Sequence, residues 1–251
     1  MNSIPLSGIV FACVFAAALV GMAIRRVLPE EHLCTDVKET VRLSTALIST
    51  MAALVLGMLV SSAKSTYDAR KNEVAEMSSE IVSIDRSLER YGPETGNIRN
   101  EFRLVVAEGI QRIWPSQTSL ASELRPGGKG ETLADQLDHL EPKTSTQAAA
   151  KSQIALEITT LRRTQWLMYL KSQHNSVPIP LLVVLTSWLV IIFVGFGLFS
   201  PPNATIFVTL GLAGLAVSAA IFIILEMYTP FTGVMRISSA PVIEALSQME
   251  R

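Results

Sequence analysis

The residues best suited to metal or nucleophilic chemistry in this chain of 251 residues are few and scattered. The thiol and imidazole groups belong to Cys13, Cys34, His32, His139 and His174. Their spacing fits neither a disulfide framework nor a zinc site, and none has a catalytic partner at a suitable spacing. We therefore expect no metal site, no cofactor and no enzyme active site.

The segment Gly127-Gly128-Lys129-Gly130 has the glycine content of a phosphate-binding loop. It lacks the upstream glycine, the Lys-Ser/Thr pair and the preceding strand that such a loop needs. We interpret it as an ordinary turn. The chain has 21 basic and 22 acidic residues and a net charge of −1, so its composition gives no electrostatic reason to expect nucleic-acid binding.

A stripe of small side chains says more about function than these scattered residues do. Small residues recur at every fourth position: Thr45, Ser49, Ala53, Gly57, Ser61 and Ser65. On a helix this spacing makes a narrow stripe that drifts slowly round the axis and carries no large side chain. One interpretation is close packing between membrane helices. The other is the wall of a pore, in which hydroxyl groups from several subunits line a wet path around a symmetry axis.

The stripe lies in one of three segments without Asp, Glu, Lys or Arg, which are residues 1–24, 43–63 and 172–225. A turn signal at Ser200-Pro201-Pro202-Asn203 divides the last of them. A helix of 21 residues covers about 31 Å, which matches the hydrocarbon thickness of a bilayer and exceeds the usual apolar run of a soluble core helix. We predict four transmembrane helices, at about 5–24, 43–63, 179–199 and 204–226.

Charged residues gather between the second and third spans. Apolar residues there recur at alternating spacings of three and four: Val74, Met77, Ile81, Ile84, Leu88 and Tyr91. This pattern predicts that the second membrane helix continues into solvent as one long amphipathic helix, which Gly92-Pro93 ends. Further helices are expected at about 98–113, 133–140 and 145–170, with an exposed loop at 116–130. We expect no sheet, because no useful alternation of period two occurs.

The sequence thus predicts an all-α integral membrane protein, with four transmembrane helices and a helical soluble domain inserted between the second and third. We divide the chain into a first helix pair, a soluble domain, a second helix pair and a tail, at 1–63, 64–178, 179–226 and 227–251. Four basic residues in the loop after the first span, against seven on the domain side, favour a cytoplasmic domain. Arg25-Arg26, directly after an uncharged first span, favour the opposite orientation. They follow that span without a small-residue cleavage site, so we expect a permanent span rather than a signal peptide.

No predicted span has a charged residue near its centre, which argues against a proton relay or a charge-coupled pump. Glu226 stands at the end of the fourth span. One interpretation is a carboxylate that snorkels to the membrane interface.

Two stretches resemble the bestrophin anion channels. Leu54–Lys71 is similar to the second bestrophin helix, an apolar span that runs into a polar helix, although Ala69-Arg70-Lys71 replaces its Arg-Trp-Trp signature. Leu225–Gly233 is similar to the Ile-Glu-Asp-Pro-Phe-Gly segment after the last bestrophin span. The matching residues are Glu226, Pro230, Phe231 and Gly233.

The whole chain is identified as a member of a bacterial bestrophin-like family, long catalogued as a domain of unknown function. The shared segments are Arg25–Glu31, Ser62–Ser65, Arg112–Pro115, Asn203–Thr205 and Ile237–Pro241. The resemblance implies a homopentamer in the bacterial inner membrane, with a central pore lined by the second helix and a cytoplasmic helical domain. It places the pore neck near Ala53, Gly57 and Ser61, where bestrophins carry larger apolar residues. Since 237–241 offers no carboxylate in place of the animal calcium clasp, we expect no calcium gating.

Two functions compete. The leading hypothesis is an oligomeric ion channel, more suited to anions, whose small-residue stripe faces the symmetry axis. The alternative is a non-conducting membrane scaffold or sensor whose helical domain binds a partner protein. The expected partners are further copies of the chain, the lipid bilayer and small inorganic or organic anions.

Overall fold

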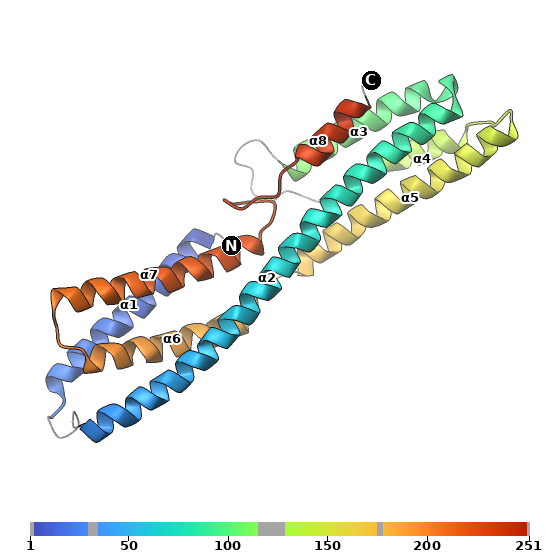
Figure 1. The fold of residues 1–251 in the computed structure, drawn as a ribbon. Helices are drawn as coiled ribbons and strands as arrows, with labels where there is room; N and C mark the ends of the chain where they lie inside the picture. Colours follow the sequence, from blue (N-terminus) through green and yellow to red (C-terminus); the bar gives the residue numbers. More distant parts are fainter. Residues whose placement is uncertain (1–2, 30–34, 115–128, 175–177, 250–251) are drawn as a thin grey trace. The chain divides into compact units, whose positions relative to one another are not determined.

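The computed structural model describes residues 3–29, 35–114, 129–174 and 178–249, and the regular elements of these residues are helices (Figure 1). In chain order they are α1 (Ser3–Val27), α2 (Thr35–Tyr91), the 3-10 helix η2 (Pro93–Thr95), α3 (Gly96–Ile113), α4 (Lys129–Asp138), α5 (Ser145–His174), α6 (Ile179–Phe199), α7 (Ala204–Met227) and α8 (Ala240–Gln248). This agrees with the all-α class predicted from the sequence.

The chain forms two compact units. The first comprises residues 1–67, 176–229 and 233–235, and holds α1, the first part of α2, α6 and α7. The second comprises residues 68–175, 230–232 and 236–251, and holds the rest of α2 with α3, α4, α5 and α8. The soluble character of the second unit stays a prediction.

Four helices are long and apolar enough to cross a membrane, namely α1, α2, α6 and α7. They correspond to the four predicted spans, and α6 has the predicted bounds. α2 continues without a break for 57 residues, as the amphipathic pattern after its apolar part predicted. It ends at Gly92, whose φ of 132° is a conformation that few residues other than glycine adopt.

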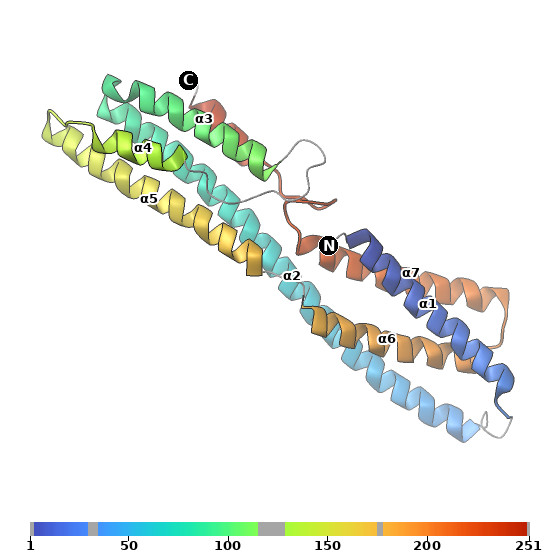
Figure 2. The same cartoon turned by 180° about the vertical axis from the view of Figure 1, so that it is seen from behind.

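In the first unit, α1 packs against α6 and α7 (Figures 1 and 2). Two glycines let α1 and α6 approach closely. A Cβ atom on Gly21 would overlap the backbone oxygen of Val194, and one on Gly197 would overlap that of Ala18. Close approach at small residues is a common way to pack helices in lipid, where the hydrophobic effect does not drive helices together. Fully buried side chains of this core include Val14, Leu185, Ile221 and Ile224.

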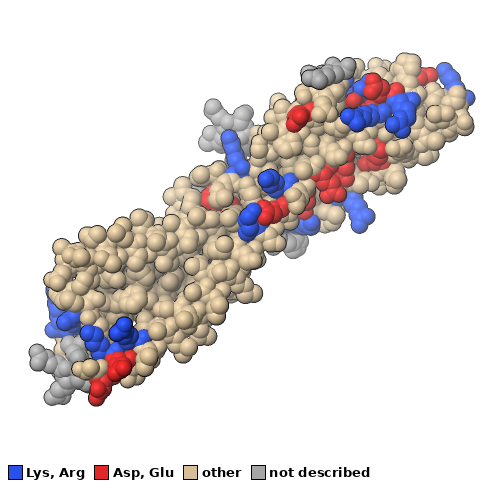
Figure 3. Space-filling model, viewed as in Figure 1, with Lys and Arg blue, Asp and Glu red and all other residues tan. Residues whose placement is uncertain are grey.

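Most charged side chains of the first unit gather where α1 ends and α2 begins (Figure 3). Exposed Lys64 and buried Glu226 lie near the other end of their helices, and Figure 3 shows an uncharged stretch of surface between the two charged zones. A charged side chain in the hydrocarbon region is costly, so this distribution is the one expected of a membrane-spanning unit.

In the second unit, the apolar residues that recur along the later part of α2 are buried, as their spacing predicted. Two of them, Met77 and Ile81, line a cavity of only about 50 Å³ together with residues of α3, α5 and α8. Asp85 of α2 accepts two hydrogen bonds from the Arg99 guanidinium of α3, at 2.9 and 2.8 Å. These hydrogen bonds raise the pKa of Arg99, since they favour its charged form.

Two elements of the second unit differ from the sequence-based expectation. α4 begins at Lys129, inside the segment 116–130 that was expected to be a loop. The rest of that segment lies outside the described residues. α8 was not predicted. Pro241 suits its first turn, and Val242 and Ala245 are buried.

Candidate functional site

The small-residue stripe of α2 does not keep to one face of the helix. An α-helix has 3.6 residues per turn, so each step of four residues turns the stripe by about 40°. Its first two members, Thr45 and Ser49, are half-buried, and Thr45 Oγ1 lies 3.2 Å from the position of a Cβ on Gly195 of α6. The other four are exposed in the single chain: Ala53, Gly57, Ser61 and Ser65.

α2 is the candidate span that its own chain covers least. Its buried residues within the first unit are Ala52, Leu59 and Ala63. Tyr228, after α7, donates a hydrogen bond of 3.3 Å from its hydroxyl to Ser62 Oγ. Only 11% of the most apolar window of α2 is nevertheless buried, against 33% for each of the other three candidate spans.

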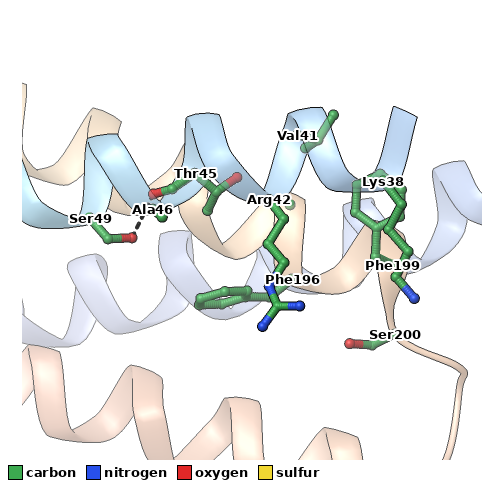
Figure 4. Close-up of a pocket in the computed structure, with 10 residues that line it drawn as sticks. Lys38, Val41, Arg42, Thr45, Ala46, Ser49, Phe196, Phe199 and Ser200 are labelled. Carbon is green, nitrogen blue, oxygen red and sulfur yellow. Dashed lines mark hydrogen bonds between the residues drawn. The ribbon is translucent and has the colours of Figure 1, made fainter. Parts of the chain in front are cut away.

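A groove of about 490 Å³ lies between α2 and α6 within the first unit (Figure 4). Its lining residues are Lys38, Val41, Arg42, Thr45, Ala46, Ser49, Gly195, Phe196, Phe199 and Ser200. Ser49 Oγ donates a hydrogen bond of 2.8 Å to Thr45 O, and the Arg42 side chain extends from α2 toward Phe196 (Figure 4). The first two residues of the predicted pore lining therefore face a wall of α6 from the same chain.

Glu226 is buried and accepts hydrogen bonds from within the protein. Its side chain is only 2% exposed. The Ser3 hydroxyl donates to Oε1, and the backbone N–H groups of Val234 and Met235 donate to Oε2 at 2.6 and 3.2 Å. The interpretation of Glu226 as a snorkelling carboxylate is therefore wrong, because its partners lie inside the protein rather than in water.

The structure divides the four motif residues after α7 into two pairs. Gly233 lies against the Glu226 carboxylate with a φ of 86°. Pro230 and Phe231 belong instead to a contact with the end of α3. The Phe231 ring meets Trp114 edge-on at 5.9 Å, and Trp114 Nε1 donates a hydrogen bond of 2.8 Å to Ile237 O.

Sequence reasoning missed the donors around Glu226. Ser3 is separated from it by 223 residues, and no repeat or spacing links the two positions. The two backbone donors depend on the turn that follows α7 rather than on side-chain type. The one usable signal was Gly233, because a glycine in a short segment after a helix often marks a positive φ.

The described residues show no grouping suited to metal chemistry. Within them, no three His, Cys, Asp or Glu side chains lie together where they could hold a metal ion. Cys13 is an exposed free thiol, and Cys34 lies outside the described residues.

Four long apolar helices, two of which approach closely at glycines, define a helical membrane protein. The bestrophin-like domain model matches residues 12–242, so this chain belongs to the bestrophin-like domain family. It is a membrane-embedded protein related to the bestrophin channels, and its family is channel-like rather than enzymatic. No curated protein and no solved structure matches the chain.

Proposed function

We propose that this protein is the subunit of a homo-oligomeric ion channel, a pentamer suited to small inorganic or organic anions, with α2 lining the pore. It lies in the bacterial inner membrane with its second unit in the cytoplasm. Family membership supports a channel-like protein. The observation that carries the proposal further is the small buried share of α2, since the remaining surface is free for lipid or for other copies of the chain.

The exposed part of the stripe favours a pore-facing role over a lipid-facing one. Ala53, Gly57 and Ser61 together leave a strip of α2 with little side-chain bulk and one hydroxyl. No atom lies within 4 Å of the position of a Cβ on Gly57. Lipid-facing surfaces have no need of such residues, whereas a narrow ring of helices requires them near its axis.

Selectivity among ions in this channel comes from the width of the pore and from uncharged hydrogen-bond donors along its wall. Residues 43–63 contain no charged side chain that could form a ring of one sign along the span. The Ser61 hydroxyl can donate a hydrogen bond to a passing anion, whereas the backbone N–H groups in the middle of α2 already donate within the helix. Such a pore discriminates among anions mainly by size.

Flux through reconstituted protein tests the proposal. Full-length protein in liposomes should pass chloride or a larger anion, and Gly57→Trp should reduce the rate by at least tenfold because the indole occupies the neck. Gly8→Trp in α1 is the matched control, since its Cβ position is equally open. Absence of flux in the wild type, or equal loss in both variants, would contradict the channel and favour the scaffold alternative.

A further inference from the structure

The groove between α2 and α6 combines a cationic mouth with an apolar body. Lys38 and Arg42 stand one turn apart on α2 and both line it. Farther from these two cations, the groove is lined by Ala46 of α2 and by Gly195 and Phe196 of α6. The Ser49 hydroxyl donates to its own helix, so this polar group does not need a partner in the groove.

The two cations are free to bind an anion. Both side chains are exposed, and neither forms a hydrogen bond or ion pair with any described residue. Two acidic residues, Asp36 and Glu39, lie on the same turn of α2 as Lys38, and neither lines the groove. An anion at the mouth would therefore meet two positive charges that form no ion pair with a described residue.

The depth of the groove matches a lipid. Arg42 immediately precedes the uncharged run 43–63, Lys38 lies one turn earlier, and α6 ends at Phe199, so the mouth is expected at the level of the bilayer interface. The Phe196 and Gly195 walls lie farther along α6 toward the hydrocarbon region. Basic pockets between transmembrane helices on the cytoplasmic side bind anionic lipid headgroups, and the same attraction between cations and phosphate acts on the opposite side, where the orientation proposed above puts this mouth.

We propose that this groove binds a phospholipid with an anionic headgroup. Its phosphate lies on Arg42 and Lys38, and one acyl chain runs along Ala46 and Phe196. The volume of about 490 Å³ is within the range of ligand pockets. The proposal does not rest on conduction, because a non-conducting scaffold with the same four spans would hold the same lipid.

Native mass spectrometry of the full-length protein in neutral detergent tests this site. The probes are phosphatidylglycerol and phosphatidylcholine with identical acyl chains. Wild type should retain phosphatidylglycerol in preference, and the double variant Lys38→Gln, Arg42→Gln should bind it roughly 25-fold more weakly, since each cation near the headgroups contributes about fivefold.

A matched control removes two other cations from the same end of the unit. Arg25→Gln with Arg26→Gln changes the charge equally but does not touch the groove, so phosphatidylglycerol binding should stay within about twofold. A second variant, Ala46→Phe, fills the groove without changing charge and should displace the lipid as well.

Three results would overturn the proposal. Equal binding of both lipids by the wild type would remove the charge complementarity. Equal loss in the Arg25/Arg26 control would show attraction by the whole surface rather than by the groove. If Ala46→Phe bound phosphatidylglycerol as well as the wild type does, the groove would not be the lipid site. This result is expected if side chains of a neighbouring copy fill the groove.

Discussion

At the scale of single residues, Glu226 is the group whose burial most needs a physical explanation. An isolated carboxylate in an apolar environment is strongly unfavourable, and it is tolerated only when hydrogen bonds replace those of water. Three donors do so here, from Ser3, Val234 and Met235. The carboxylate thereby ties the segment after α7 to the start of α1 inside the first unit.

Replacing Gly233 by alanine tests this arrangement. The positive φ strains any residue with a side chain, and the new Cβ would overlap the Glu226 carboxylate. We expect Gly233→Ala to lower the free energy of unfolding by about 1–3 kcal/mol. The measurement is the unfolding temperature of the detergent-solubilised protein by circular dichroism.

Gly8→Ala serves as the control for this prediction, because no atom lies within 4 Å of its Cβ position. It should leave the unfolding temperature unchanged or raise it slightly, because alanine favours a helix more than glycine does. If both variants unfold at the same temperature, the close contact between Gly233 and Glu226 is not what stabilises this segment.

Glu80 makes the stability of the second unit depend on pH. Burial raises the pKa of its carboxyl above the ordinary value of 4.5, the Thr164 hydroxyl lowers it by a smaller effect, and Glu76 raises it further. A group whose pKa is higher in the folded state contributes stability below its unfolded pKa, and this contribution is lost as the pH rises through the folded pKa. Removing the charge should therefore stabilise the protein at neutral pH.

Glu80→Gln should raise the unfolding temperature slightly at pH 7 and leave it nearly unchanged near pH 4. The measurement is the difference in unfolding temperature between the two pH values, for variant and wild type. Glu141→Gln, at an exposed position, controls for the loss of one negative charge. The same pH dependence in wild type and Glu80→Gln would contradict the assignment.

At the scale of elements, the contact between α1 and α6 depends on two glycines. Because the atoms that a new Cβ would meet are backbone oxygens, a side-chain rotation cannot relieve the overlap. We expect Gly197→Ala to push the helices apart and cost about 1–3 kcal/mol. The loss is measured as a lower unfolding temperature and a smaller monodisperse peak in size-exclusion chromatography.

Gly211→Ala in α7 is the matched control for this contact. The nearest atom to its Cβ would be 3.6 Å away, which is an ordinary van der Waals distance. A drop in stability as large as that of Gly197→Ala would mean that helix propensity or lipid contact, rather than close packing, explains the effect.

The elements themselves could be predicted because their signals are local. The charge-free runs predicted the bounds of α6 and α7 to within one residue. The alternating spacing of three and four predicted that α2 continues as far as Tyr91, directly before Gly92. α8 escaped prediction because nine residues hold too few turns to show a periodicity.

The contacts of the candidate sites could not be predicted, since each joins distant parts of the chain. Trp114 and Ile237 are 123 residues apart, and the sequence identified both segments as motifs without showing that they meet. The 40° drift of the small-residue stripe follows from its spacing of four. Which part of the stripe α6 covers, at Thr45 and Ser49, depends on how the helices pack.

At the scale of the whole molecule, a pore along α2 depends on what covers the part of this helix that its own chain leaves exposed. The large apolar residues exposed on its membrane part include Leu43, Leu47, Met51, Leu54 and Met58. These can meet lipid or another copy of the chain. At 100° per residue, Ala53 and Gly57 lie beside this sector, whereas Ser61 follows Leu43 by five full turns and lies on the same side as Leu43. In a ring of copies, Ala53 and Gly57 can face water while the large residues beside them face lipid or neighbouring helices.

The most direct test of the pore is the reactivity of single cysteines on α2 in the reconstituted protein, with Cys13 and Cys34 replaced. Ala53, Gly57, Ser61, Met51 and Met58 are all exposed in the single chain, so any difference among them reports the assembly. A charged, membrane-impermeant thiol reagent should modify cysteines at 53, 57 and 61, and modification at 57 should reduce anion flux. Cysteines at 51 and 58 should stay unmodified. If all five positions are equally unreactive, α2 does not line a water-filled pore.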